Sequence, residues 1–193
     1  DGLSGAYLAA RTAAIHNDYA AAADYYTKAL LRDPKNPLLL EYALVGQVSL
    51  GRFDAGLPRA KRLGEIGVDS RIGRVVEMTD RIGRKAWDEL IASLATEQVS
   101  PVVDGLAAAW AQVGAGRMSD AIAAFDKMAA TEQLRFIALD NKAMALAAVG
   151  DFEGAEAIYA GEEKDGRFRM TRRAAIARAQ ILSQIDRAPD AVA

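Results

Sequence analysis

The chain has 193 residues, of which 51% are hydrophobic, and its charges nearly cancel to a formal net charge of −2. This composition supplies material for a buried core, and the balanced charge argues against nucleic acid or an anionic membrane as the main partner. The lack of cysteine excludes disulfides and thiolate sites, and a single histidine, His16, excludes a two-histidine metal site.

Segments rich in Ala and Leu, separated by helix breakers, predict helices along the whole chain, and the alternation typical of strands is absent. Pro37 and Pro101 each fall at a predicted helix start, where the missing N–H costs nothing. Asp33-Pro34-Lys35-Asn36-Pro37 is predicted to be a turn, because a residue before proline avoids the helical region. In chain order, the predicted helices run over residues 4–16, 19–32, 37–50, 53–66, 70–82, 85–97, 101–115, 118–130, 133–149, 152–163 and 168–185.

A short turn motif recurs between these helices: a small or polar residue, a polar residue, and often an aromatic or large apolar residue. Successive motifs are 34, 32, 33, 34 and 36 residues apart, close to the 34-residue period of one type of helical repeat. The motifs are Asn17-Asp18-Tyr19, Gly51-Arg52-Phe53, Gly83-Arg84-Lys85, Gly116-Arg117-Met118, Gly150-Asp151-Phe152 and Asp186-Arg187-Ala188.

Side-chain sizes also return at fixed distances from each turn. Seven residues before it, the chain has Ala10, Leu44, Val76, Ala109, Ala143 and Ala179, all small or apolar. Small residues let paired helices approach, and larger ones fill the space to the next pair. The third unit departs from the pattern, with Lys85 and Asp88 where an aromatic and a small residue are usual.

The chain resembles the tetratricopeptide repeat (TPR) family over essentially its full length. The closest motifs are Asp18-Tyr19 followed by Ala22, Tyr26, Ala29 and Pro34, and Gly150-Asp151-Phe152 followed by Ala155 and Tyr159. The resemblance implies an all-α fold, a right-handed α-solenoid of about five complete TPR-like helix hairpins plus a partial sixth.

We expect one superhelical domain over residues 1–193, with repeats near 3–36, 37–68, 69–101, 102–135, 136–169 and a partial repeat over 170–193. Because the last repeat is incomplete, we expect the native chain to continue. The segment from Leu3 to Ala10 is similar to exported bacterial TPR proteins, which predicts a periplasmic or cell-envelope location, with the cytoplasm as the alternative.

In TPR proteins the first helix of each hairpin lines the concave side, so the resemblance implies a partner-binding groove there. Its apolar residues suit an amphipathic helix or an apolar peptide, although Leu106 and Trp110 are equally consistent with core positions. The predicted groove residues are Tyr7, Arg11, Glu41, Val45, Val48, Leu106, Trp110, Val113, Asp140 and Met144.

We find no catalytic constellation, and we expect no enzyme activity, cofactor or metal. A basic cluster at Lys164, Arg167, Arg169, Arg172, Arg173 and Arg178 is more typical of a solvated helix start than of a nucleic-acid site. The leading hypothesis is a protein-interaction scaffold with a protein or peptide partner. The alternatives are a regulatory or targeting arm of a longer enzyme or transcription factor, and a solenoid that associates with itself.

Overall fold

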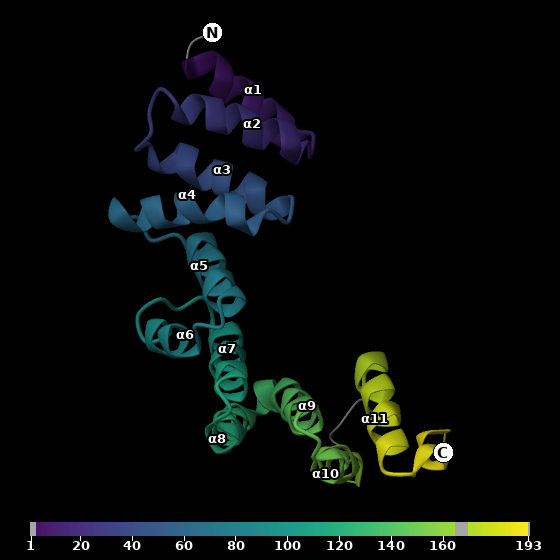
Figure 1. The fold of residues 1–193 in the computed structure, drawn as a ribbon. Helices are drawn as coiled ribbons and strands as arrows, with labels where there is room; N and C mark the ends of the chain where they lie inside the picture. Colours follow the sequence, from purple (N-terminus) through teal and green to yellow (C-terminus); the bar gives the residue numbers. More distant parts are fainter. Residues whose placement is uncertain (1–2, 165–169, 193) are drawn as a thin grey trace. The chain divides into compact units, whose positions relative to one another are not determined.

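The computed structural model describes residues 3–164 and 170–192, and within these ranges it contains helices and no strand. The chain divides into two compact units, Asp1–Val99 and Ser100–Ala193. Each unit is a row of antiparallel helix hairpins in which consecutive helices pack against one another (Figure 1). The all-helical prediction is therefore confirmed.

The first unit contains three hairpins. They are formed by α1 (Leu3–Ile15) and α2 (Tyr19–Leu30), α3 (Pro37–Ser49) and α4 (Phe53–Glu65), and α5 (Arg71–Gly83) and α6 (Trp87–Ser93). Besides the consecutive contacts, α3 packs against α5, so the first helices of the second and third hairpins lie side by side.

The second unit continues the same arrangement. It contains α7 (Pro101–Gly114) and α8 (Met118–Ala129), α9 (Glu132–Ala148) and α10 (Phe152–Lys164), then α11 (Arg172–Gln184) and a short 3-10 helix, η1 (Ala188–Val192). Here too the first helices are neighbours, since α9 packs against both α7 and α11. The described residues thus form five complete hairpins and the first helix of a sixth, as predicted.

One type of turn follows the first helix of each hairpin. Its central residue has a positive φ, from 56° to 87°, and lies two residues beyond the helix end. The next residue donates its backbone N–H to the carbonyl five residues earlier, as Asp18 does to Ala13 and Arg52 to Gln47, both at 2.9 Å. This Schellman cap satisfies carbonyls that the helix end leaves unpaired. The positive-φ residues of these turns are Asn17, Gly51, Lys85, Gly116, Gly150 and Asp186, and Gly67 forms the same turn after α4, the second helix of its hairpin.

The third turn lies two residues beyond the predicted one, so that prediction was wrong in register. Gly83 is the last residue of α5, and Lys85 adopts the positive φ of 56°. A positive φ is easiest for glycine, but other residues can adopt it, and here a lysine does. Counting from Lys85 puts Leu90, which is only 1% exposed, in the position that the prediction gave to Asp88. The third hairpin therefore follows the repeat pattern better than its sequence indicated.

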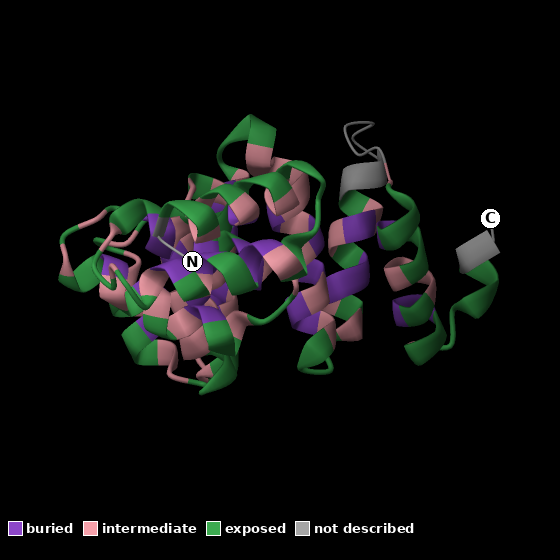
Figure 2. Cartoon of the chain, turned by 90° about the horizontal axis from the view of Figure 1, so that it is seen from above, coloured by how far each residue is buried: buried purple, intermediate pink, exposed green. Residues whose placement is uncertain are grey.

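The buried side chains form clusters that each join one hairpin to the first helix of the next. Figure 2 shows the buried positions along the helices in purple. Ala10, Tyr26 and Leu39, for example, bring together α1, α2 and α3. Small residues set the spacing between helices: a Cβ added at Gly46 of α3 would lie 3.0 Å from the Cβ of Ala23 in α2. A hairpin alone would leave one apolar face exposed, and stacking buries it.

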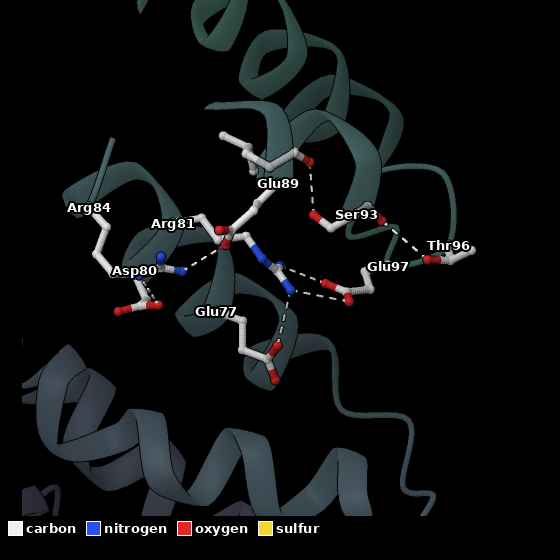
Figure 3. Close-up of polar contacts among 9 residues, drawn as sticks. Glu77, Asp80, Arg81, Arg84, Glu89, Ser93, Thr96 and Glu97 are labelled. Atoms are coloured by element: carbon white, nitrogen blue, oxygen red, sulfur yellow. Dashed lines mark hydrogen bonds and ion pairs between the residues drawn. The ribbon is translucent and has the colours of Figure 1, made fainter. Parts of the chain in front are cut away.

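The second helix of the third hairpin is shorter than predicted. α6 ends at Ser93 rather than at residue 97, and the Ser93 hydroxyl donates to the Leu90 carbonyl at 2.8 Å. The following segment is held to α5 by Arg81, whose Nη1 lies 2.7 Å from Glu97 Oε2 and whose Nη2 lies 3.4 Å from Glu77 Oε2 (Figure 3). Ion pairs therefore connect this segment to α5, in place of an amphipathic helix.

The last helix is held by a buried ion pair. Glu156 of α10 is 3% exposed, and its two carboxylate oxygens accept hydrogen bonds of 3.0 and 2.9 Å from Arg178 of α11. α11 begins at Arg172, whereas the predicted helix starts at residue 168. Residue 168 lies outside the described residues. Two parallel bonds between a guanidinium and a carboxylate fix orientation as well as distance, so α11 is aligned on α10.

Candidate functional site

The predicted groove residues of the first unit lie on α1 and α3 with different exposures. Arg11 is exposed and Val45 is 36% exposed, whereas Tyr7 and Val48 are partly buried against the core clusters. Glu41 is also partly buried, and its Oε2 is a buried acceptor without a hydrogen-bond partner. An unpaired buried oxygen costs about 1–3 kcal/mol, so Glu41 is poised to accept a hydrogen bond.

The predicted apolar groove residues of the second unit are tied to its core. Leu106, Trp110 and Val113 are partly buried and pack against the cluster around Phe125. The Trp110 ring meets the Phe125 ring edge to face, with centroids 6.1 Å apart, and its Nε1 donates to Asn141 Oδ1 at 3.0 Å. Trp110 therefore joins α7 to α9 and leaves part of its surface open.

Asp140 and Met144 also have partners within the second unit. Asp140 is 8% exposed and accepts a 2.8 Å hydrogen bond from the Tyr159 hydroxyl. Burial raises the pKa of Tyr159, and the hydrogen bond to Asp140 raises it further. Met144 is partly buried, and Arg173 Nη2 lies 3.7 Å from its sulfur. The Asp140 carboxylate thus connects α9 to α10 inside the hairpin.

Sequence reasoning missed an exposed apolar face on α3. Leu38, Tyr42 and Val45 are 60%, 42% and 36% exposed, at spacings of four and three residues that place them on one side of the helix. The spacing was readable in the sequence, but the repeat pattern alone selected Glu41 and Val45 and passed over their neighbours. Large apolar side chains held in water at helical spacing are typical of a surface that another molecule covers.

A hollow of about 440 Å³ opens beside this face. It lies between α1 and α3 and has a mostly apolar lining. The lining residues are Ser4, Tyr7, Leu8, Asn36, Leu38 and Leu39. A hollow of this size admits one large side chain of a partner, and Tyr7 and Leu38 connect it to the exposed face.

Three tyrosines from three helices meet next to the hollow. The ring of Tyr26, on α2, stacks on that of Tyr42 at a centroid distance of 5.1 Å and meets that of Tyr7 edge to face at 6.3 Å. Burial raises the pKa of Tyr26, the hydroxyls of Tyr7 and Tyr42 raise it further, and the Arg11 guanidinium acts in the opposite direction. The Tyr26 hydroxyl is therefore a protonated donor at neutral pH, and it lies near one cation, the Arg11 guanidinium.

The described residues offer no other chemical centre. They contain no group of three or more acidic, histidine or cysteine side chains arranged to hold a metal ion. Among the helices described, none is both long and apolar enough to cross a bilayer. In the basic cluster, Arg178 pairs with Glu156, Arg172 and Arg173 are exposed, and Arg167 and Arg169 lie outside the described residues.

Comparison with solved structures identifies similar folds at low sequence identity. A tetratricopeptide repeat protein from Parabacteroides merdae aligns with a TM-score of 0.74 at 14% identity, over 98% of this chain and 76% of that chain. MamA aligns with a TM-score of 0.66 at 15% identity, over 88% of this chain and 96% of that chain. PilW, a widely conserved type IV pilus biogenesis factor, aligns at 0.64 and 18% identity, over 98% and 89%.

No model of a known protein family matches the sequence, and no curated protein matches it. The structural matches and the recurring capped turns nevertheless agree with the resemblance derived from the turn motifs. The chain has the tetratricopeptide-repeat fold.

Proposed function

We propose that this chain is a non-catalytic scaffold that binds a protein partner through a peptide or helix lying on the first helices of its hairpins. In the first unit the binding surface consists of α1 and α3, with Leu38, Tyr42 and Val45 as its exposed apolar residues. That exposed row is the observation on which the proposal depends. A few buried aromatic and aliphatic side chains supply most of the affinity in interfaces of this kind.

Polar groups on the same helices support the proposal. Arg11 is exposed, and Glu41 has a buried acceptor oxygen without a partner. That oxygen lies beneath the surface, so the exposed Arg11 guanidinium is the one of these two groups that a bound segment can contact directly. Apolar side chains would then provide affinity, and the polar groups would set the position of the segment.

The second unit offers a surface of its own on α7 and α9. We propose partner contacts for the open parts of Leu106, Trp110 and Met144. Asp140, Val48 and Val113 act beneath the surface: Asp140 bonds to Tyr159, and the two valines pack on core clusters. These three residues support the helices that carry the contact residues.

Affinity capture from the cells that make the protein tests this proposal. The double variant Tyr42→Ala, Val45→Ala should recover at least about tenfold less partner than the wild-type chain, because two exposed anchors are lost. The matched control is Val149→Ala with Ile176→Ala, two side chains that are 57% and 51% exposed on the second unit. Equal recovery with both double variants would rule out the α3 surface.

A cell-envelope location is part of the proposal. It is supported by the similarity of the N-terminal segment to exported bacterial TPR proteins and by the structural likeness to PilW. Cell fractionation tests it: the protein should appear in the periplasmic or envelope fraction, and recovery with cytoplasmic markers alone would contradict it.

A further inference from the structure

The tyrosine cluster on α1, α2 and α3 contains donors that the protein itself does not use. Tyr26 is only 4% exposed, yet its hydroxyl bonds to none of the described residues. The hydroxyls of Tyr7 and Tyr42 are close enough to influence its ionisation, and so is the Arg11 guanidinium. The cluster thus places the Tyr7 and Tyr42 rings against Tyr26, with the Arg11 guanidinium near enough to act on the Tyr26 hydroxyl.

Such a set of groups favours an anionic acceptor. A neutral oxygen can accept from either kind of group, but a carboxylate forms stronger, charge-assisted hydrogen bonds with the guanidinium and can accept from a hydroxyl as well. Glu41 is adjacent to Tyr42 in sequence, but it makes no hydrogen bond to these hydroxyls. Within the described residues no carboxylate bonds to these hydroxyls, so a bound segment can supply one.

The apolar hollow next to the cluster indicates that the bound segment carries an apolar side chain near its carboxylate. Tyr7 belongs to both, since it lines the hollow and contacts Tyr26. Arg11 follows Tyr7 by one helical turn, which corresponds to about 6 Å along α1. In an extended peptide, side chains two residues apart point to the same side and are about 7 Å apart. The two spacings match.

We propose that the α1–α3 surface binds an extended peptide segment in which an apolar and an acidic side chain are two residues apart. The apolar side chain enters the hollow lined by Tyr7, Leu8 and Leu38, and the carboxylate accepts from the tyrosine hydroxyls and Arg11. This specificity rests on the proposed function, because it names the chemistry of the peptide that the scaffold holds.

Titration of the isotope-labelled full chain, followed by NMR, tests the specificity with defined probes. The acidic probes are Ac-Leu-Ala-Glu-NH2 and its reverse, Ac-Glu-Ala-Leu-NH2, and the neutral controls carry Gln in place of Glu. At concentrations up to about 10 mM, at least one acidic probe should shift the signals of residues 4–11 and 38–42. Its neutral counterpart should bind at least about tenfold more weakly, the effect of losing one charge-assisted hydrogen bond.

Three variants separate the hydroxyls and the cation from general packing. Tyr26→Phe and Tyr42→Phe each keep a stacked ring and remove its hydroxyl, the first at a buried residue and the second at an exposed one. Arg11→Gln removes the positive charge. Each should reduce the preference for Glu over Gln at least about threefold, corresponding to part of one hydrogen bond. The matched control, Arg32→Gln, alters an exposed arginine outside the hollow and should keep the full preference.

The outcomes distinguish this specificity from the scaffold function itself. Equal binding of the acidic and neutral probes at residues 4–11 and 38–42 would overturn the acidic preference and leave the scaffold proposal standing. If no probe binds while the wild-type chain still captures a partner through Tyr42 and Val45, the acidic preference is likewise overturned and the scaffold proposal stands. A circular dichroism melt of each variant confirms that a lost preference does not reflect unfolding.

Discussion

At the scale of single residues, two pairs of buried polar side chains have a structural task that is visible in their partners. Glu156 and Arg178 align α11 on α10, and Tyr159 donates to Asp140 across the fifth hairpin. Tyr159 itself is fully buried. Removing one member of such a pair lowers the free energy of unfolding more than a surface substitution does, because the other member stays buried without its partner.

Tyr159→Phe should lower the free energy of unfolding by about 1–3 kcal/mol. The ring remains in place, but the Asp140 carboxylate loses its buried donor. Tyr25→Phe is the matched control, since Tyr25 is 37% exposed, and it should change stability by no more than about 0.5 kcal/mol. Urea denaturation followed by circular dichroism measures both, and similar effects for the two variants would contradict the assignment.

Stability should also fall at alkaline pH because of Tyr159. Its pKa is raised in the folded state above the ordinary value of 10.0, first by burial and then by the hydrogen bond to Asp140. Above about pH 10 the unfolded chain releases this proton while the folded chain keeps it, so the free energy of unfolding decreases as pH rises. The contribution is fully present below pH 10.

Urea denaturation at about pH 8 and about pH 11 measures this loss. Other groups titrate in the same range, so the informative quantity is the difference between the wild-type chain and Tyr159→Phe. The wild-type chain should lose more stability than the variant between the two pH values. An identical loss would show that Tyr159 ionises no later in the folded chain than in the unfolded one.

At the scale of helices and turns, a capped turn with a positive φ follows the first helix of every hairpin, and one also follows α4 at Gly67. The turn does not require glycine: Asn17, Lys85 and Asp186 adopt it alongside Gly51, Gly116 and Gly150. Left-handed conformations cost a non-glycine residue roughly 1–2 kcal/mol, so the hydrogen bonds and packing of the turn must offset that cost. Glycine in the sequence is accordingly an imperfect marker of the turn.

Gly83→Ala and Gly116→Ala should change stability in opposite directions. Gly83 ends α5 in helical conformation with open space around its Cβ position, so alanine should add about 0.5–1 kcal/mol. Gly116 has a φ of 75°, where alanine should cost about 1 kcal/mol. Thermal denaturation of both variants checks the register of the third turn. If Gly83→Ala instead destabilised the protein, the result would favour the turn with its positive-φ residue at Gly83.

The helices could be predicted from sequence because their causes are local. Pro37 and Pro101 start helices in the structure as expected, and the turn motifs and helix breakers located most of the remaining boundaries. The early end of α6 was not predictable in this way, because it is accompanied by contacts of Arg81 with Glu97 and Glu77. Such ion pairs leave no periodic pattern in the sequence.

The candidate site was only partly predictable for a related reason. Tyr7, Arg11 and Val45 follow from the repeat positions and lie on α1 and α3. Tyr26 was identified only as a large core residue, and Tyr42 was not identified. Their meeting with Tyr7 requires three helices to be packed, and no spacing within one helix reveals it.

At the scale of the whole chain, the buried clusters fall within two compact units. The clusters around Tyr26 and Leu44 belong to the first unit, and those around Phe125 and Tyr159 belong to the second. In repeat proteins each hairpin contacts mainly its neighbours, so stability is the sum of local terms. The prediction of a single domain over residues 1–193 remains a prediction.

Fragments covering residues 1–99 and 100–193 should each fold, with thermal unfolding that is cooperative and lower in midpoint than that of the whole chain. Each unit keeps its own buried clusters, but units of about 100 residues have only a few kcal/mol of stability. Circular dichroism melts of the two fragments and the intact chain test this. Two unfolded fragments from a stable intact chain would show that the units depend on each other.

Site-specific photocrosslinking in living cells tests the central claim most directly. A photoreactive phenylalanine analogue replaces Tyr42 on the exposed face of α3 in one sample, and Val149, a more exposed apolar residue after α9, in another. We predict a discrete covalent adduct with a partner protein from position 42 and none from position 149. The same adducts from both positions, or none from position 42 while the chain remains folded, would contradict a binding surface on α3.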